Sequence, residues 1–501
     1  MNLNINLDLK SETKFVNNFF SHVHFHPTDA IEDDWGRKII DRMASDKSVK
    51  RIRIYTMFED IVTISENGEL LYDYTLTDYR IDYLVKNGFE LLICFNFMPF
   101  CIAKDKTAIS HLERYKDKKI CFSAPKDYKL WQEICAHYTK HLIERYGKNQ
   151  VTKWYFHCWN EPDHHYWMNN VPCTEFNLEK AEEYVKLYDY FATGVTSVCP
   201  EILVGGPAAA GQEEFLEYFL SHIANDLNFA TGKKDIRFDF FSMHTYETLS
   251  DTNPAVTAKI GTVYKFLKQL KKYSLENKPI VMDEWGAMVN GFVNFKQKPI
   301  LELREKTYLS AYYAKFIDLF SKEITENNLD LRFCMFCLAG QHTSTYDFDG
   351  YRSFFTLNGY AKPIYNAYTM CAKLGEEQYT VDVNDKTVGC VATKTDKGYA
   401  ILLYNFEDDT ALTIPTKQVK LSLANIFGEK RICTYIIDTA HSSGYDEFIR
   451  LGKPEVIDAA THEKLVNASA LFSKKQTYEC SGNLELEITL EQNASVLIEI
   501  E

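Results

Sequence analysis

Short apolar runs alternate with longer amphipathic stretches over roughly the first 370 residues of the chain. Eight runs have the length of buried strands. They lie near residues 15–26, 50–56, 89–98, 153–160, 202–206, 238–246, 279–284 and 332–338. Stretches between them have the apolar spacing of helices, such as 35–45, 78–87, 127–146, 178–198, 256–273 and 302–325. Strands that alternate with helices predict a parallel sheet, either closed into a barrel or open and doubly wound.

The connections between these elements favour the barrel. No glycine-rich GxGxxG or GxxxxGK[ST] loop opens a helix, which argues against a nucleotide-binding doubly wound sheet. We therefore predict a (β/α)8 TIM barrel over residues 14–372.

The pattern changes after Gly375, where strands and turns replace the alternation. Candidate strands lie at 387–393, 399–405, 411–415, 431–437, 484–490 and 495–501. In the run 484–490, apolar residues occupy every second position, as in a strand with one buried face. We predict a C-terminal all-β sandwich domain over residues 373–501. The alternating segment 1–10 is expected to join it as an N-terminal strand.

Composition narrows the class of partner. Hydrophobic residues make up 46% of the chain and charged residues 25%, as in ordinary globular proteins. The net charge is −14 without a basic stripe, so we expect no nucleic-acid partner. An acidic polymer would be repelled, which favours a neutral oligosaccharide or small glycoside as the substrate. The aromatic content of 14% suits sugar rings, although aromatic residues also fill cores.

Targeting signals and cysteines point to a reducing compartment. The first residues lack the basic and apolar regions of a signal peptide, and no run of 18 apolar residues exists. Thirteen irregularly spaced cysteines are typical of free thiols. Cys334 and Cys337 have CxxC spacing, but on a strand they face opposite ways, so we expect no redox or metal chemistry there. We predict a cytoplasmic protein without a membrane partner, and a homo-oligomer is compatible with the sequence.

The first chemical signal is the strand 153–160, which ends in Asn160-Glu161-Pro162. Pro162 stops the strand, so Glu161 lies at its carboxyl end, where barrel active sites are built. The flanking aromatic residues would desolvate the carboxyl group and favour the protonated form, as a general acid requires. A helix cap is the structural alternative for this glutamate.

The second signal is the strand 279–284, which delivers Glu284 to the same mouth. Two converging carboxylates are what glycosidic cleavage needs. Neighbouring strand residues point oppositely, so we expect only one of Asp283 and Glu284 to enter the barrel. On the preceding strand His244 and Tyr246 share a face, and the Tyr246 hydroxyl could hold Glu284 in its ionised form. Next to Glu284, Trp285 is a further candidate for binding the sugar.

A competing signal is the cluster His22, His24 and His26 on the first predicted strand. Such spacing is typical of metal-dependent amidohydrolase-type barrels. That site needs ligands on later strands, where His222 and His244 are candidates, but no aspartate ends the eighth strand. We expect no metal and no cofactor. Either His24 or His26 lines the sugar pocket, or the histidines are structural. A non-catalytic carbohydrate-binding barrel is the other alternative, and the two glutamates argue against it.

Several segments together resemble family 39 of the glycoside hydrolases, the β-xylosidase group of a clan with catalytic glutamates on strands 4 and 7. They are residues 154–162, 204–207, 244–246 and 283–284, with further likeness at 79–100, 183–207 and 359–367. The resemblance spans about residues 15–375. It implies a (β/α)8 barrel and cleavage of β-linked neutral sugars, β-xylosides first, with net retention.

The same resemblance assigns roles to individual residues. Glu161 would be the acid/base and Glu284 the nucleophile. Asn160 would hydrogen-bond the sugar 2-hydroxyl, while His244 and Tyr246 would line the −1 subsite.

Two departures leave the choice of sugar open. The second strand reads Arg53-Ile54-Tyr55 where these β-xylosidases usually carry Arg-Phe-His, so Tyr55 is expected to face the sugar. The eighth strand and its loop, residues 334–342, lack the usual tryptophan and acidic loop. Xylose, arabinose and other neutral glycones remain candidates.

Overall fold

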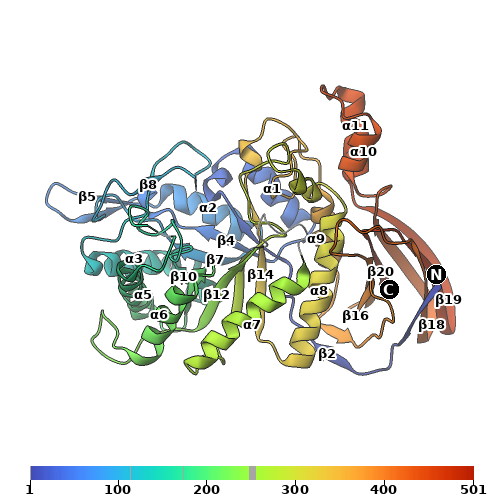
Figure 1. The fold of residues 1–501 in the computed structure, drawn as a ribbon, viewed down its shortest axis with the longest axis horizontal. Coiled ribbons are helices and arrows are strands. Elements are labelled where there is room, and N and C mark those ends of the chain that lie inside the picture. Colours follow the sequence, from blue (N-terminus) through green and yellow to red (C-terminus); the bar gives the residue numbers. More distant parts are fainter. Residues whose placement is uncertain (1, 113, 173, 247–254) are drawn as a thin grey trace.

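The computed structural model describes residues 2–112, 114–172, 174–246 and 255–501 (Figure 1). Eight parallel strands close into a barrel in chain order, which confirms the predicted TIM barrel. They are β3 (His22–Phe25), β4 (Arg51–Tyr55), β7 (Glu90–Phe95), β10 (Tyr155–Cys158), β11 (Leu203–Ala209), β12 (Phe240–Thr245), β13 (Ile280–Trp285) and β14 (Leu331–Leu338).

Helices surround the barrel and lie close to the predicted stretches. They are α1 (Asp34–Ser45), α2 (Thr75–Lys86), α3 (Tyr128–Tyr146), α4 (Lys148–Val151), α5 (Leu178–Val198), α6 (Glu213–Asn225), α7 (Val256–Lys272), α8 (Tyr308–Asn327) and α9 (Pro363–Cys371). Helix α8 starts later than predicted because Pro299–Arg304 forms a separate 3-10 turn. No helix in the described part of the chain is long and apolar enough to cross a bilayer.

The loops that follow the strands carry short elements of their own. These are the 3-10 turns at Thr28–Glu32, Phe58–Asp60 and Gln341–Thr343 and the small strands β5 (Val62–Ile64), β6 (Leu70–Tyr72), β8 (Ile109–Ser110) and β9 (Ile120–Cys121). β5 pairs with β6 and β8 with β9, both antiparallel.

The barrel interior is layered along its axis. An apolar cluster of Leu92, Phe240, Val281, Phe333 and Met335 fills the interior below the mouth. On β4, Arg51 packs against the Phe333 ring of that cluster, with its guanidinium carbon 4.7 Å from the ring centroid. Side chains two positions further along a strand lie one level nearer the carboxyl end. This apolar cluster therefore forms the floor of the barrel mouth, and the polar groups of the mouth lie above it.

The C-terminal domain is built on one sheet of order β1-β18-β20-β17-β16-β15-β2, with β19 paired to β18. Its strands are β1 (Asn2–Asp8), β2 (Thr13–Phe15), β15 (Glu377–Tyr379), β16 (Val388–Thr395), β17 (Gly398–Asn405), β18 (Lys417–Ile437), β19 (Phe472–Leu490) and β20 (Ala494–Ile500). The first half of β18 pairs with β1 and its last residues pair with β20. One buried cluster joins side chains of β1 to those of β16 and β17, so the sheet folds over into two layers.

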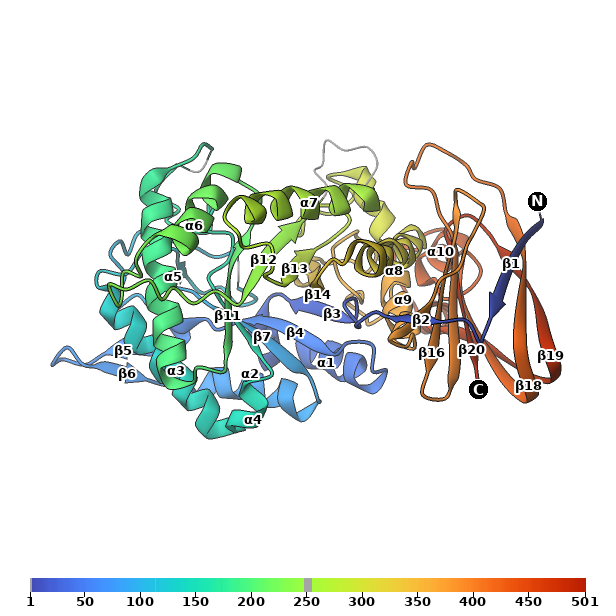
Figure 2. The same cartoon turned by 90° about the horizontal axis from the view of Figure 1, so that it is seen from below.

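The first and last strands, β1 and β20, both belong to this domain, and α8 lies between it and the barrel (Figure 2). β1 runs parallel to β18 and places Ile5 and Leu7 in the shared core. At the junction with the barrel, the Tyr404 hydroxyl on β17 donates to the Asp318 carboxylate on α8 at 2.7 Å. The Tyr308 and Phe406 rings pack edge to face across the same junction, with centroids 4.8 Å apart.

Two expectations for this domain are wrong. Residues 411–415 form no strand, because the Leu412 amide closes a turn on the Asp409 carbonyl and its side chain stays exposed. The domain is also not all β. Helices α10 (Gly444–Arg450) and α11 (Ala459–Ser469) join β18 to β19. They bury Tyr445 and Leu465 against Phe348 and Tyr360 of the segment that follows β14.

Candidate active site

The two predicted glutamates meet at the carboxyl end of the barrel. Glu161 follows β10, and Glu284 lies near the end of β13. One carboxylate oxygen of each lies within 4.8 Å of the other and of a His244 ring nitrogen. Trp159 and Glu161 have left-handed backbones, with φ of 63° and 42°. Such conformations are costly for non-glycine residues and are found at functional sites. They are held here by hydrogen bonds from the Trp159 amide to Phe95 and from the Glu161 amide to Ala208.

The Glu161 carboxyl group favours its protonated form. Burial raises its pKa, and the nearby charge of Glu284 raises it further, while the hydrogen bond and charge of His244 oppose both effects. His244 Nδ1 lies 2.7 Å from Glu161 Oε1. A carboxyl group with a raised pKa, next to a second carboxylate, is suited to donate a proton.

The Glu284 carboxylate favours its ionised form. Arg53 Nη1 donates to its Oε1 at 2.6 Å, and the Tyr246 hydroxyl donates to its Oε2 at 2.7 Å. His24 Nδ1 lies 3.0 Å from Oε1. Burial by itself would raise the pKa of Glu284, but His244, His24 and Arg53 together hold it well below its usual range. The pKa values of the two glutamates are therefore shifted in opposite directions although the groups are neighbours.

Arg53 lies beneath both catalytic candidates and is fully buried. Besides Glu284, it donates through Nη2 to Asn160 Oδ1 at 2.7 Å and through Nε to His157 Nε2 at 3.1 Å. Its Nε also lies 3.4 Å from Asp283 Oδ2. Because Arg53 occupies the amide oxygen of Asn160, the NH2 group of that amide is the part free to meet a sugar hydroxyl.

Asp283 enters the barrel together with Glu284, so the expectation that only one of them would do so is wrong. Between β12 and β13, Met243 pairs with Met282. The next residue, His244, pairs with Glu284, so Asp283 has no partner on β12. This bulge breaks the alternation of side chains that the strand rule assumes. Although burial raises the pKa of Asp283, Arg53 and His244 outweigh it, so the group is held ionised.

His244 connects the acidic groups of the site. Burial lowers its pKa, but the charges of Glu284 and Asp283 prevail and raise it to about 10. The ring is therefore an imidazolium at neutral pH, and it donates Nδ1–H to Glu161. Its Nε2 lies 3.6 Å from Asp283 Oδ1, and its Nδ1 lies 3.7 Å from Glu284 Oε2.

Most of the predicted sugar-binding residues do gather at this mouth. Asn160, His244 and Tyr246 contact the two glutamates or Arg53, as described above. The Tyr55 ring lies 4.9 Å from the His24 ring, with the Arg53 guanidinium carbon 5.4 Å from its centroid. Tyr55 and His24 therefore form one wall of the site.

Trp285 does not belong to the site, contrary to the prediction. It is fully buried and faces helix α8, where it stacks on Phe316 with ring centroids 4.6 Å apart and an interplanar angle of 8°. It follows Glu284 on the strand and so points out of the barrel into the helical layer.

Of the three predicted histidines only His22 lies apart, because the His24 and His26 rings are 5.6 Å from each other and the His26 ring is 5.5 Å from Tyr55. The His22 ring lies at the floor, 5.5 Å from Phe333, with Nε2 bonded to the Asn18 carbonyl. His24 does lie with Glu284 and Cys337 in a group that could hold a metal ion. However, Arg53 Nη1 is 3.0 Å from His24 Nδ1 and 2.6 Å from Glu284 Oε1, and this cation occupies the donor atoms that a metal would need. The geometry therefore does not favour the metal hydrolase.

The eighth strand turns its two cysteines to opposite sides, as predicted. Cys334 packs in the core between barrel and helices. Cys337 faces the site, where its Sγ lies 3.5 Å from His24 Nδ1 and accepts a hydrogen bond from Arg352 Nη2 at 3.2 Å.

Arg53, His157, Cys337 and Arg352 are site residues that were not predicted from the sequence. Arg53 shares a face with Tyr55 and His157 precedes Trp159 by two, so strand periodicity could have found both. Arg352 lies in a loop, where no periodic signal exists.

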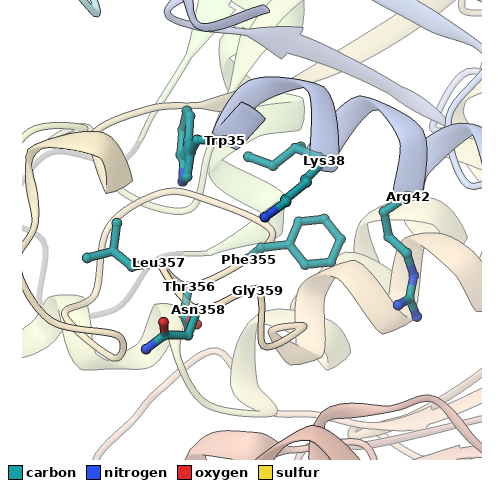
Figure 3. A pocket seen from close by; sticks show the side chains of 9 residues that line it. Trp35, Lys38, Arg42, Phe355, Thr356, Leu357, Asn358 and Gly359 are labelled. Carbon is teal, nitrogen blue, oxygen red and sulfur yellow. The ribbon is translucent and has the colours of Figure 1, made fainter. Parts of the chain in front are cut away.

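A surface pocket of about 490 Å³ lies outside this mouth, between α1 and residues 355–359 (Figure 3). Trp35, Lys38 and Arg42 line it from the helix side. Neither glutamate of the site lines it, so we do not place the reaction there. Its other wall belongs to the segment that also carries Arg352.

Comparisons with known proteins agree with this geometry. Residues 3–485 match the model of glycosyl hydrolases family 39. The chain is 26% identical over 482 residues to a beta-xylosidase of Caldicellulosiruptor saccharolyticus, covering 93% of this chain and 91% of the relative. It is 25% identical over 460 residues to a beta-xylosidase of Geobacillus stearothermophilus, covering 87% and 82%. The fold matches the crystal structure of a monomeric beta-xylosidase from Caulobacter crescentus CB15 with a TM-score of 0.81 at 20% identity, covering 100% and 99% of the chains.

Proposed function

This chain belongs to family 39 of the glycosyl hydrolases, and we propose that within the family it is a retaining β-xylosidase. As a family member it is an O-glycosyl hydrolase that acts on a sugar substrate. The proposal assigns Glu161 as the acid/base and Glu284 as the nucleophile. Two curated relatives that match most of the chain are both named beta-xylosidases, which supports the choice of glycone.

The observation that carries the mechanism is the close pair of carboxyl groups whose pKa values are shifted in opposite directions. Retaining glycosidases hold their carboxyl groups about 5 to 5.5 Å apart, and inverting enzymes hold them about 6.5 to 9.5 Å apart. A separation of at most 4.8 Å between one oxygen of each carboxyl group leaves no room for a water between Glu284 and the anomeric carbon. It supports direct attack by Glu284.

In the first step, the ionised Glu284 attacks the anomeric carbon while Glu161 gives its proton to the leaving oxygen. The C–O bond to the leaving group breaks and a glycosyl ester forms on Glu284. Tyr246 and Arg53 each donate to one oxygen of Glu284, so the carboxylate is oriented before the sugar arrives.

In the second step, Glu161 takes a proton from water, which attacks the ester and releases the sugar. Ester formation neutralises Glu284 and removes a charge that raises the pKa of Glu161. The acid of the first step thereby becomes a better base for the second.

Azide rescue of variants tests the two roles. With 2,4-dinitrophenyl β-xyloside, whose departure needs little acid, Glu161→Ala should regain turnover with azide and yield the β-xylosyl azide. Glu284→Ala should yield the α-xylosyl azide, because azide then attacks from the vacated nucleophile side. Glu201→Gln, whose carboxylate pairs with Lys148 on the surface, is the control and should match the wild type. The same azide anomer from both variants would contradict the assignment.

A further inference from the structure

Arg352 is a buried cation at the edge of the proposed −1 subsite. It lies in the β14–α9 segment, residues 339–362, and only 6% of it is exposed. Its backbone is fixed by a β-bridge to Ala339, whose amide donates to the Arg352 carbonyl at 2.6 Å. The guanidinium therefore has a defined position beside the catalytic groups.

The contacts of this guanidinium are a ring, a thiol and a carbonyl. Its carbon lies 4.5 Å from the centroid of Tyr246. Nη2 donates to Cys337 Sγ at 3.2 Å and Nη1 donates to the Val289 carbonyl at 2.9 Å. Burial raises the pKa of the Cys337 thiol to about 12, so this group is neutral and does not cancel the charge. A desolvated cation over an aromatic face is attracted by the negative face of the ring, so the guanidinium and the Tyr246 ring hold each other in place.

Two glycines make room for this arrangement. A Cβ atom on Gly286 would lie 2.9 Å from Arg352 Cδ and 3.0 Å from Tyr246 Cε1. A Cβ atom on Gly291 would lie 3.0 Å from Arg352 Nη2. Real Cβ contacts are hardly ever so short, so a side chain at either position would push the guanidinium and the ring apart.

The ring under Arg352 is the one that orients the nucleophile. Tyr246 donates its hydroxyl to Glu284 Oε2 at 2.7 Å. We propose that Arg352, held by Cys337 and Val289, is a positioning residue of the reaction, which fixes the Tyr246 ring so that its hydroxyl stays on the nucleophilic carboxylate. Cys337 lies on the strand where the resemblance leads one to expect a tryptophan, so the thiol and the guanidinium together form this wall of the subsite. The role as a positioning residue rests on the proposed function.

Charge adds to this positional effect. Arg352 and Glu284 interact favourably, and the carboxylate contributes to raising the pKa of Arg352. By reciprocity, the fixed cation favours the ionised form of Glu284. Removing Arg352 should therefore raise the pKa of the nucleophile as well as loosen Tyr246.

Kinetics of Arg352→Met on 4-nitrophenyl β-xyloside test the consequence. We expect kcat to fall by up to about 100-fold, the loss that misplacement of a reacting group by about 1 Å can cause, with KM changed less than about threefold. The acidic limb of kcat/KM should move to higher pH. Arg42→Met is the matched control, because Arg42 also lies over a tyrosine ring, at 5.9 Å from Tyr365, but outside the mouth (Figure 3). It should keep wild-type kinetics.

A double-mutant cycle separates positioning from direct contact with substrate. In a Tyr246→Phe background, Arg352→Met should cost less than about threefold in kcat, because the hydroxyl it positions is gone. An equal loss in both backgrounds, or wild-type kcat in the single variant, would overturn the proposal.

If Arg352→Met does not fold, Arg352→Lys replaces it. A lysine keeps the charge but cannot face the ring and bond both partners, so kcat should still fall, and wild-type kcat would again be contrary.

A crystal structure of the Arg352 variant gives a readout that needs no substrate. The Tyr246 hydroxyl should move from 2.7 Å to more than about 3.5 Å from Glu284 Oε2, beyond hydrogen-bond range. An unchanged distance would overturn the positioning role, even if the enzyme cleaves β-xylosides. A wild-type enzyme without activity on β-xylosides would instead reject the proposed function, and the crystal would still decide on Arg352.

Discussion

At the residue scale, the chemistry depends on neighbours that treat two identical side chains differently. The Glu284 carboxylate receives hydrogen bonds from Arg53 and Tyr246. Among the contacts that the structure describes, the Glu161 carboxyl group meets only His244 within hydrogen-bond distance. The first group is therefore held as a carboxylate, and the second keeps its proton to higher pH. The charge of each also changes the pKa of the other, so their titrations are coupled.

This coupling predicts that the pKa of Glu161 falls when Glu284 becomes an ester. A 2-deoxy-2-fluoro-xylosyl group on Glu284 removes the negative charge that raises the pKa of Glu161. Glutamate labelled with 13C is titrated by NMR, and the Glu161→Gln variant assigns the Glu161 signal. The midpoint of that signal should lie at lower pH in the fluoroxylosyl enzyme than in the free enzyme. An unchanged or higher midpoint would speak against the acid-to-base switch.

Asp283 should matter for stability as much as for catalysis. It is fully buried beside Arg53 and His244, so Asp283→Asn leaves both cations poorly compensated. We expect a loss of about 3 to 5 kcal/mol in the free energy of unfolding by urea at pH 7. The exposed pair of Asp330 with Arg332 provides the control, Asp330→Asn, which should change it by less than about 1 kcal/mol.

The pH dependence of this contribution has a defined sign. The pKa of Asp283 is lowered in the folded chain, so its stabilisation is complete above the usual aspartate value of about 3.9 and is lost as the pH falls through the folded value. The difference in the free energy of unfolding between the wild type and Asp283→Asn should therefore become smaller only at acidic pH. If this difference in unfolding free energy stays constant down to the lowest measurable pH, the charge of Asp283 is not the cause of the stabilisation.

At the scale of elements, strand ends were the part of the site that the sequence could reveal. Apolar runs that stop at Asn160-Glu161-Pro162 and at Glu284 place both carboxyl groups at one barrel mouth, because all the strands are parallel. The period-two rule failed at Asp283, where a bulge removes one pairing. Arg352 could not be found in this way, since it reaches the site from a loop whose path depends on tertiary packing. Only the end of the long strand β18 was predicted, at 431–437. Its middle residues are exposed and do not alternate, whereas its first half does alternate and was missed.

The pairing of β1 with β18 gives an element-scale prediction. Ile5 has no exposed surface and packs in the core of the C-terminal domain. Ile5→Ala should lower the free energy of unfolding by about 2 to 5 kcal/mol, through lost burial and the cavity left behind. Asn4 is exposed on the same strand, so Asn4→Ala should shift it by no more than about 0.5 kcal/mol. Urea titration compares them, and equal effects would mean that β1 does not pack as described.

At the scale of the whole molecule, the C-terminal domain supports the barrel at two places. Tyr404 bonds to Asp318 on helix α8, and Tyr445 and Leu465 cover the β14–α9 segment that carries Arg352. The catalytic mouth therefore depends on contacts from both parts of the chain.

The Tyr404 contact should be measurable as a link between the two parts. Tyr404→Phe leaves a buried oxygen of Asp318 without this donor, which costs about 1 to 3 kcal/mol of unfolding free energy. Tyr478→Phe removes an exposed hydroxyl that bonds Gln476, and it should cost less than about 0.5 kcal/mol. Both variants should keep wild-type kcat, since neither hydroxyl touches the mouth. No loss of stability in Tyr404→Phe would argue that the junction is not formed as described.

The most direct test of the central claim is to identify the residue that carries the covalent intermediate. The enzyme is incubated with 2,4-dinitrophenyl 2-deoxy-2-fluoro-β-xyloside, digested and analysed by tandem mass spectrometry. The account predicts one fluoroxylosyl group per chain, attached to Glu284 and to no other residue. A label on Asp283 or Glu161, or an active enzyme that forms no covalent adduct and releases α-xylose first, would contradict it.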